Sequence, residues 1–510
     1  MKKLIIGYFN SLKKDIFKHK VSYLILFLAL VVGGYARFHH IVDYAVFSFD
    51  QGRDMLVVWD IVYNHNPTLI GPVTGLQGVF LGPFYYYLTA IPFILSGGHP
   101  MSSAIFIDLV GLLTIPISYL IILKLFNRTT ATIAAMIVAI SPFLVFYSRF
   151  AWNPNILPPI ALVFYFCLVR VCQGRVKFVY LGTLALALAL QTEAASAFFY
   201  FPTIILAFLI YRPKVKIKSL IYCGIILISS ISPIILFELR NHFLISKNLA
   251  KFFTGRQNNY LITTQSFGQR RTLLGDVFSN TFYFKTVRVG VVFVWLSLIF
   301  SAIKILGNTR NEKEIPLKIA FLWMVINLTG LVFFYPGIIF EHFLFSMIVV
   351  MVILGSYFLS TLYEKYNVWG KATVIVFLLL MFLSITQTLN LLKTPEEDTS
   401  RRVSYLDQLA AIFYIYNDSK GQSFALNVYT PPAIDYSFQY LVKWYAKSHN
   451  LPVPQAPSRL TYLILEPKPS VPSQESVTSF DRWYMEAKAS GVLVDRVNVS
   501  GGLIIEKRVK

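Results

Sequence analysis

The sequence of 510 residues is poor in charge, in cysteine and in phosphate-binding motifs. Only 14% of the residues are charged, against 56% that are hydrophobic, which excludes a soluble globular protein because such a protein must have a wettable surface. The three cysteines, Cys167, Cys172 and Cys223, lie in or beside apolar runs. Their number and spacing indicate neither a disulfide scaffold nor a zinc site. No glycine-rich phosphate loop of the nucleotide-binding kind is present.

Acidic residues are also scarce, with 25 aspartates and glutamates against 46 lysines and arginines and a net charge of +21. Such an excess is typical of nucleic-acid-binding proteins. In polytopic membrane proteins, however, basic residues gather in the cytoplasmic loops. We therefore expect no nucleic-acid partner.

Long apolar runs are what the sequence has in abundance. A membrane with a hydrocarbon core of about 30 Å is crossed by a helix of roughly 20 apolar residues, and the alternating pattern of an outer-membrane barrel is lacking. The fold class is therefore an all-α polytopic membrane protein. We expect about eleven transmembrane helices, near residues 21–36, 102–123, 131–147, 156–170, 178–191, 198–211, 217–237, 286–303, 317–335, 343–361 and 372–390.

The distribution of basic residues predicts how these helices are oriented. Lysines in "MKKLIIGYFNSLKKDIFKHK" hold the N-terminus in the cytoplasm, and the other cytoplasmic loops are marked by basic clusters at 124–128, 170–177, 212–218, 304–318 and 365–371. The location that follows is a bacterial-type cytoplasmic membrane. The apolar run 80–95 has no place in this count, because a crossing there would invert every later basic loop. We expect it to form an amphipathic or re-entrant helix on the outer side.

Two domains are expected. Residues 1–392 form the transmembrane domain, with a first outer loop at 37–101 and a second large outer loop at 238–285. Residues 393–510 alternate amphipathic helices with short strands, such as "SFALNVY" and "LTYLILE". An odd number of crossings places this small α/β domain outside the membrane. It contains no catalytic motif.

The stretch "FSFDQGRDMLVVWD" gathers charges where the first apolar run ends. Ser48 and Gln51 have the spacing of a capping box, so a helix should begin here with Asp50 in its first turn and with Asp50, Arg53 and Asp54 on one face. The helix start stabilises an ionised carboxylate by about 0.3 to 1 kcal/mol, and an ionised carboxylate can accept a proton. The alternative is that Asp50 only complements the helix dipole while Arg53 and Asp54 pair in solvent.

Other polar residues lie at the outer ends of the expected helices and so at the same level as this motif. They are Arg149, Asn153, Asn155, Glu193, Glu341 and His342, and Tyr86 of the outer run 80–95 is added to them as an aromatic suited to a sugar. Charges at this level of a helical bundle tend to face an aqueous cavity, which favours a site. Four of them have a structural alternative: an interfacial belt for Tyr86, snorkelling for Arg149, a solvated loop for Glu193 and a structural hydrogen bond for His342.

The second outer loop breaks the charge rule, because it is rich in cations, among them Arg256, Arg270 and Arg271. This excess favours an anionic ligand, either a phosphate or a lipid headgroup. The alternative is that long loops cross the membrane regardless of their charge.

Taken together, the acidic motif, the aromatic "GPFYYYL" and the segment "LVGLLTIPISYLIILKLFNRTTATIAAMIVAISPFLVFYSRFAWNPN" resemble the membrane glycosyltransferases of the GT-C fold. The sequence is most similar to the bacterial relatives of protein O-mannosyltransferases and of aminoarabinose lipid A transferases, the family-39-like group. The resemblance covers roughly the first 240 residues well. Two departures stand out: Gln51 replaces a glutamate common in the family, and Asn153-Pro154-Asn155 stands where an aspartate is often found.

The resemblance implies transfer of a hexosyl or pentosyl group from a polyprenyl-phosphate donor to a protein, lipid or glycan acceptor on the outer face, with inversion. Asp50 matches the catalytic base. The residues expected to bind substrate are Arg53, Asp54, Tyr86, Arg149, Asn153, Glu193, Arg256, Arg270, Arg271, Glu341 and His342. The sequence supports no metal site and no cofactor. A transporter of a lipid-linked or anionic substrate is the main alternative, but it predicts inverted repeats and charges at the middle of the membrane.

Overall fold

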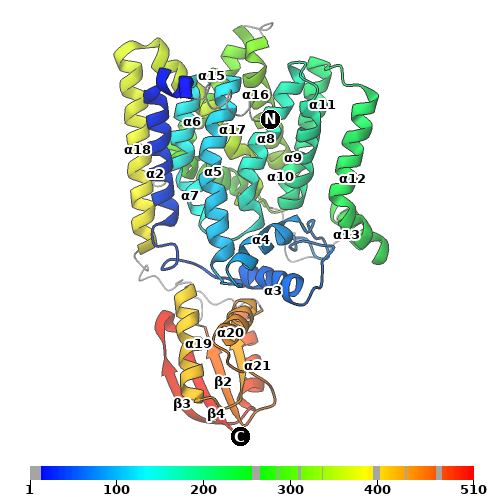
Figure 1. The fold of residues 1–510 in the computed structure, drawn as a ribbon, viewed down its shortest axis with the longest axis vertical. Helices are drawn as coiled ribbons and strands as arrows, with labels where there is room; N and C mark the ends of the chain where they lie inside the picture. The colour runs from blue at the N-terminus through cyan, green and yellow to red at the C-terminus, as the bar shows by residue number, and fades with distance from the viewer. Residues whose placement is uncertain are drawn as a thin grey trace.

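A computed structural model describes residues 13–254, 265–283, 287–307, 312–335, 337–393, 403–430, 434–466 and 474–510. A bundle of long helices forms most of the molecule, and a small domain with a β-sheet lies beyond one end of the bundle (Figure 1). The described residues confirm the predicted fold class, a helical membrane domain followed by a small α/β domain.

Within the described residues, nine helical segments are long enough and apolar enough to cross a membrane. Their helices are α2 (Lys20–Phe38), α5 (Ser102–Leu125), α8 (Leu157–Cys172), α11 (Tyr200–Tyr211, preceded by α10, Ala194–Ala197), α12 (Ile217–Arg240), α15 (Val287–Gly307), α16 (Ile315–Thr329), α17 (Phe345–Lys365) and α18 (Asn367–Lys393). The protein is therefore a multi-pass membrane protein.

A tenth crossing is formed if the bent pair α6 (Arg128–Ile140) and α7 (Pro142–Ser148) counts as one span. The two helices meet at 54°, where Pro142 cannot donate a backbone hydrogen bond and Ser141 caps the second helix. Helix α9 (Phe178–Thr192) is apolar but has only 15 residues. The count of eleven crossings therefore stays a prediction.

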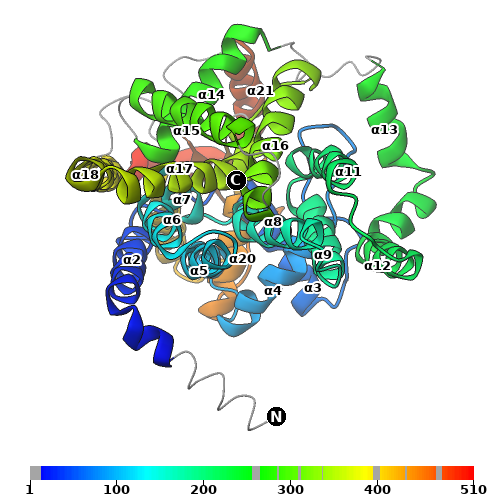
Figure 2. The same cartoon turned by 90° about the horizontal axis from the view of Figure 1, so that it is seen from above.

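Helix α17 forms the centre of the bundle, and every residue from Phe345 to Ser356 is buried. Its sequence is apolar on every side, which suits a helix surrounded by others. Figure 2 shows α6, α7, α8, α15 and α16 around it, with α2 and α12 at opposite margins. Helix α12 is the reverse case, because Glu238 is its one buried residue. Its apolar side chains face outward and are suited to contact lipid.

Helices α3 (Phe49–Tyr63) and α4 (Phe84–Leu95) lie at the end of the bundle that faces the small domain (Figure 1). Helix α4 corresponds to the apolar run 80–95. It has 12 residues and contains Pro92, so it is too short to cross a membrane. Helix α13 (Leu244–Phe253) of the second large loop lies on the same side of the fold (Figure 1), and α14 (Phe267–Phe282) of that loop contacts α7.

The small domain contains a four-stranded sheet in the order β1-β2-β4-β3. Strand β1 (Phe424–Tyr429) pairs in parallel with β2 (Leu460–Leu465), and β4 (Ile504–Val509) runs antiparallel to β2 and to β3 (Val492–Asn498). The helices are α19 (Tyr405–Ser419), α20 (Tyr436–Ser448) and α21 (Gln474–Lys488). The predicted alternation of helices and strands is confirmed, except that the sequence pattern did not reveal β3, which is almost entirely exposed.

Candidate active site

Helix α3 begins as the sequence predicts. Ser48 has an extended backbone and precedes the first helical residue. The side-chain oxygen Oε1 of Gln51 accepts hydrogen bonds from the backbone N–H of Ser48, at 2.9 Å, and from its hydroxyl, at 2.5 Å. This places Asp50 in the first turn, where unpaired backbone amides favour a carboxylate.

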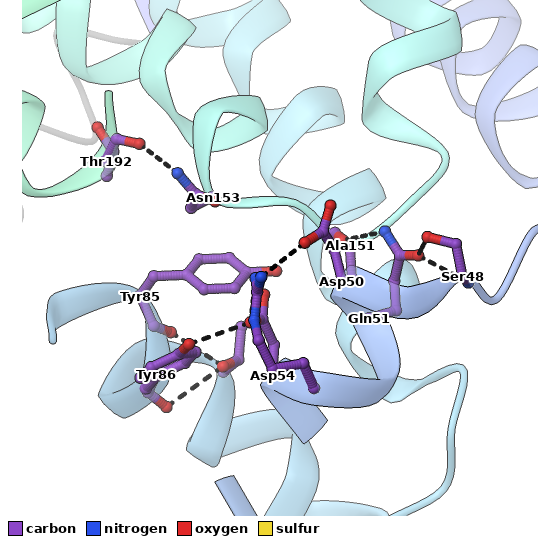
Figure 3. Close-up of polar contacts among 11 residues, drawn as sticks. Ser48, Asp50, Gln51, Asp54, Tyr85, Tyr86, Ala151, Asn153 and Thr192 are labelled. Atoms are coloured by element: carbon purple, nitrogen blue, oxygen red, sulfur yellow. Dashed lines mark hydrogen bonds and ion pairs between the residues drawn. The ribbon is translucent and has the colours of Figure 1, made fainter. Parts of the chain in front are cut away.

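Arg53 lies between two carboxylates of the same helix, and the three residues form what we call the acidic triad (Asp50, Arg53 and Asp54). Its Nη1 is 2.7 Å from Oδ1 of Asp50, and its Nη2 is 2.7 Å from Oδ1 of Asp54. Tyr86 of α4 donates a further hydrogen bond to Asp54 over 3.1 Å (Figure 3). The side chain of Asp54 is only 5% exposed, whereas that of Asp50 is 37% exposed. The pair of Arg53 and Asp54 is therefore buried rather than solvated.

Burial changes the pKa of Asp54, the more buried of the two carboxylates in the acidic triad. Loss of water raises the pKa of Asp54 to about 6, although the neighbouring Arg53 and the hydroxyl of Tyr86 oppose the shift. For Arg53, burial disfavours the charge, but the carboxylates of Asp54 and Asp50 outweigh burial and raise its pKa. Arg53 therefore stays cationic and holds Asp50, the more exposed acid.

The loop before α8 connects α3 to two other parts of the bundle. Gln51 donates from Nε2 to the carbonyl oxygen of Ala151 at 2.8 Å. Next along the chain, the Trp152 ring packs against His342 with 4.6 Å between ring centroids. Asn153 then donates to the carbonyl oxygen of Thr192 over 2.6 Å (Figure 3). The consecutive residues Ala151, Trp152 and Asn153 thus contact the start of α3, the segment before α17 and the end of α9.

A second polar group lies beside this loop. His342 Nε2 is 3.6 Å from Oε2 of Glu193, and both side chains are largely buried. Glu193 also accepts a hydrogen bond from the backbone N–H of Ala195. Glu341 accepts a hydrogen bond from the hydroxyl of Tyr147. The structure therefore brings Asn153, Glu193 and His342 together through the loop, as their position at the ends of the expected helices implies.

The predicted cations outside α3 have different surroundings. Arg149 donates to the carbonyl oxygens of Ala36, Arg37 and His39 at the end of α2. Arg270 is buried and donates to four carbonyl oxygens, those of Leu331, Val332, Tyr335 and Gly337. Both guanidinium groups thus hold backbone ends in place. Arg271 is exposed, and Arg256 lies outside the described residues.

Two buried charged residues that the sequence pattern did not predict, Arg37 and Asp108, lie near the end of α2. Asp108, in the first third of the apolar helix α5, accepts a hydrogen bond from the hydroxyl of Ser148 at 2.9 Å. The side chain of Arg37 donates to the carbonyl oxygens of Gly33, Val138 and Ala139. A lone acid within the run "IFIDLVGLL" was the available signal, because charges inside spans are costly and usually have a role.

Among the residues that the structure describes, no group of three or more histidines, cysteines, aspartates or glutamates is placed to hold a metal ion. The chemistry that the site itself offers is that of a partly exposed carboxylate, kept in position by an arginine. Such a group can act as a base toward a hydroxyl.

The sequence matches the family model for dolichyl-phosphate-mannose-protein mannosyltransferases over residues 81–237. Among curated proteins, none matches it significantly. Similar solved structures include ArnT from Cupriavidus metallidurans bound to undecaprenyl phosphate, with 13% identity, a TM-score of 0.60 and coverage of 96% of this chain and 98% of the other. ArnT in the apo state has 12% identity, a TM-score of 0.61 and coverage of 96% and 97%.

An oligosaccharyltransferase from Archaeoglobus fulgidus, in the apo form, is also similar. It shares 14% identity and a TM-score of 0.51, over 83% of this chain and 60% of the other. The likeness to ArnT extends over nearly the whole of both chains, the small domain included. The chain therefore has the GT-C fold of membrane glycosyltransferases.

Proposed function

We propose that the protein is a glycosyltransferase that moves a sugar from a polyprenyl-phosphate carrier to an acceptor hydroxyl on the outer face of the membrane. The GT-C fold supports this proposal, as does the similarity to ArnT, which has been seen with undecaprenyl phosphate. The observation that carries it is the acidic triad, in which Arg53 holds the partly exposed Asp50 at the start of α3.

In the proposed reaction, the acceptor oxygen attacks the anomeric carbon while Asp50 takes its proton. The bond from that carbon to the phosphate oxygen breaks, and the phosphate leaves with the electron pair. Direct displacement inverts the anomeric centre. A positioned base of this kind contributes about 10² to 10⁴-fold to the rate. Asp50 uses Oδ1 for Arg53, and we assign Oδ2 to the acceptor hydroxyl.

The remaining residues support this step in two ways. Asp54 and Tyr86 fix the guanidinium of Arg53, which in turn orients Asp50. Asn153, Glu193, Glu341 and His342 are proposed to bind the sugar or the acceptor, since they adjoin the loop that contacts α3. A leaving phosphate needs cations, and the exposed Arg271, together with Arg256, is proposed to supply them. For Arg149 and Arg270, direct contact with substrate stays a prediction.

The orientation of the chain is part of the proposal. The N-terminus lies in the cytoplasm, the membrane is of the bacterial cytoplasmic type, and α3 and the small domain lie outside. The basic clusters of the sequence support this orientation. It brings the acidic triad to the compartment in which a lipid-linked sugar is used.

The test is to compare the lipid-linked sugars and envelope glycans of cells that lack the protein with those of cells that express it. Mass spectrometry should show a polyprenyl-phosphate sugar that accumulates without the protein and a glycan that disappears. Asp50→Asn should behave like the absence of the protein, while remaining folded. Asp43→Asn is the matched control, because Asp43 is exposed and pairs with His40. Transfer retained in Asp50→Asn would remove Asp50 from the base role.

A further inference from the structure

Helix α3 has two faces with different partners. In a helix with about 100° between residues, Asp50, Arg53 and Asp54 share one side, Gly52 and Trp59 lie on the other, and Phe49 lies at the border beside Arg53. Helix α3 lies next to α20 of the small domain (Figure 1), and Gly52 and Trp59 face that helix. The helix that bears the proposed base is therefore held between the bundle and the small domain.

The two helices approach each other closely at Gly52. A Cβ atom there would lie 2.3 Å from the backbone nitrogen of Ser437 and 2.4 Å from the carbonyl carbon of Tyr436. These backbone atoms cannot rotate away as a side chain would. Glycine inside a helix costs about 0.5 to 1 kcal/mol relative to alanine, and Gly52 lies inside α3. The close approach of the two chain segments explains why it is there.

Aromatic and charged side chains extend the contact along both helices. The Phe49 ring lies 5.0 Å from that of Tyr436, measured between centroids. Farther along α3, Trp59 is buried. The Nζ atoms of Lys443 and Lys447 lie 4.9 and 4.8 Å from the centroid of its ring. A cation over an aromatic face is stabilising, by about 0.5 to 2 kcal/mol. The orientation of α3 is therefore fixed over more than two turns.

Hydrogen bonds from the small domain also hold the segment that leads into α3. Gln408 of α19 donates from Nε2 to the carbonyl oxygen of Phe47 over 3.1 Å, and the backbone N–H of Tyr405 donates to Ala45 over 2.9 Å. Gln408 and Phe47 are both buried. Ser48, the residue that begins the helix, follows directly. The start of α3 is thus fixed by residues more than 350 positions away.

We propose that the small C-terminal domain acts as a positioning element for the transfer reaction, with Gly52 and Gln408 as its principal positioning residues. This inference rests on the proposed function of Asp50. The domain sets the direction of α3, and α3 sets where the Asp50 carboxylate meets the acceptor. A displacement of about 1 Å in a reacting group can reduce a rate by about 10²-fold. Donor binding, by contrast, depends on other residues.

The experiment compares full-length wild-type protein with Gly52→Ala and Gln408→Ala. The first variant forces α3 away from α20, and the second removes one hydrogen bond without a steric clash. Gly224→Ala is the control, because Gly224 lies in α12 with no atom within 4 Å of an added Cβ. We expect kcat to fall by about 10- to 100-fold in Gly52→Ala and by less in Gln408→Ala. KM for the polyprenyl-phosphate sugar that accumulates in cells without the protein should stay within about twofold, because neither substitution changes a residue proposed to bind that donor.

Hydrogen–deuterium exchange of the same proteins gives a readout that does not depend on activity. Exchange should become faster in α3 in both variants and stay unchanged in α5 and α17. Wild-type kcat in both variants would overturn the proposal, and so would faster exchange spread evenly over the bundle. If the wild-type protein transfers no sugar, the proposed function fails, and the exchange data decide separately whether the small domain positions α3.

Discussion

Gln51 joins the start of α3 to the loop before α8 by donating a hydrogen bond from Nε2 to the carbonyl oxygen of Ala151. Its other side-chain atom, Oε1, accepts from Ser48. The residue thus needs a donor and an acceptor at once. This explains the departure from the glutamate that is common in similar sequences, because an ionised carboxylate has no proton to donate.

Gln51→Glu should therefore destabilise the protein. The carbonyl oxygen of Ala151 would lose its donor and face a negative charge, and a buried polar group left unpaired costs about 1 to 3 kcal/mol. Thermal unfolding in detergent should show a lower Tm for this variant. Gln422→Glu, at an exposed position of the small domain, is the matched control and should leave Tm unchanged. An equal Tm for both variants would contradict the role of the amide.

The pKa of Asp54 predicts how the reaction depends on pH. Burial raises this pKa from 3.8 in a free side chain to about 6. The folded protein therefore takes up a proton at Asp54 as the pH falls through about 6. Asp54 then loses its negative charge, and its ion pair with Arg53 is lost. Ionisation of Asp54 correspondingly costs folding stability, a cost that is absent below about pH 4 and complete above about pH 6.

We expect kcat/KM to fall on the acid side of about pH 6, while the folded state gains stability over the same range. Asp54→Asn should have low activity with a flatter acid limb, because the titrating group is gone. The measurement is a pH profile of kcat/KM from about 4.5 to 8. An unchanged acid limb in Asp54→Asn would assign that limb to a different group.

Tyr86→Phe tests the hydrogen bond that Tyr86 donates to Asp54 of the acidic triad. The hydroxyl of Tyr86 donates to Asp54 and stabilises its ionised form, so its removal should raise the pKa of Asp54 further. The acid limb of the pH profile should then shift to higher pH. Tyr87→Phe is the control on the same helix, because Tyr87 is exposed and donates to the carbonyl oxygen of Thr68. Identical profiles for the two variants would rule out this contribution.

Arg270 and Arg271 are neighbours in the sequence, but substitution of each by lysine should affect the stability of the protein very differently. Arg270→Lys replaces a planar group that satisfies four carbonyl oxygens with one that cannot reach them all. We expect a loss of about 1 to 3 kcal/mol for the carbonyl oxygens left unpaired, visible as a lower Tm. Arg271→Lys, at an exposed position, should keep the wild-type Tm. Equal stability of the two variants would show that the carbonyl contacts of Arg270 contribute little.

Local signals in the sequence predicted much of the fold. The Ser48 and Gln51 pattern located the start of α3 within one residue, and apolar runs located the membrane helices because their length is set by the bilayer. The contacts between residues far apart in the sequence could not be predicted from local patterns. That Arg270 bonds to carbonyl oxygens more than 60 residues away, or that Gly52 meets Ser437, depends on packing that no local pattern encodes. Asp108 is an exception, since its place in an apolar run was a visible signal.

The loop formed by Ala151, Trp152 and Asn153 contacts Gln51, His342 and Thr192 in consecutive steps. Insertion or deletion of one residue in this loop would displace the residues that make these contacts and disrupt all three. Two of the contacts involve backbone carbonyl oxygens, which every amino acid has. Evolution should therefore conserve the length of this loop more strictly than its composition, and related sequences should align through it without gaps.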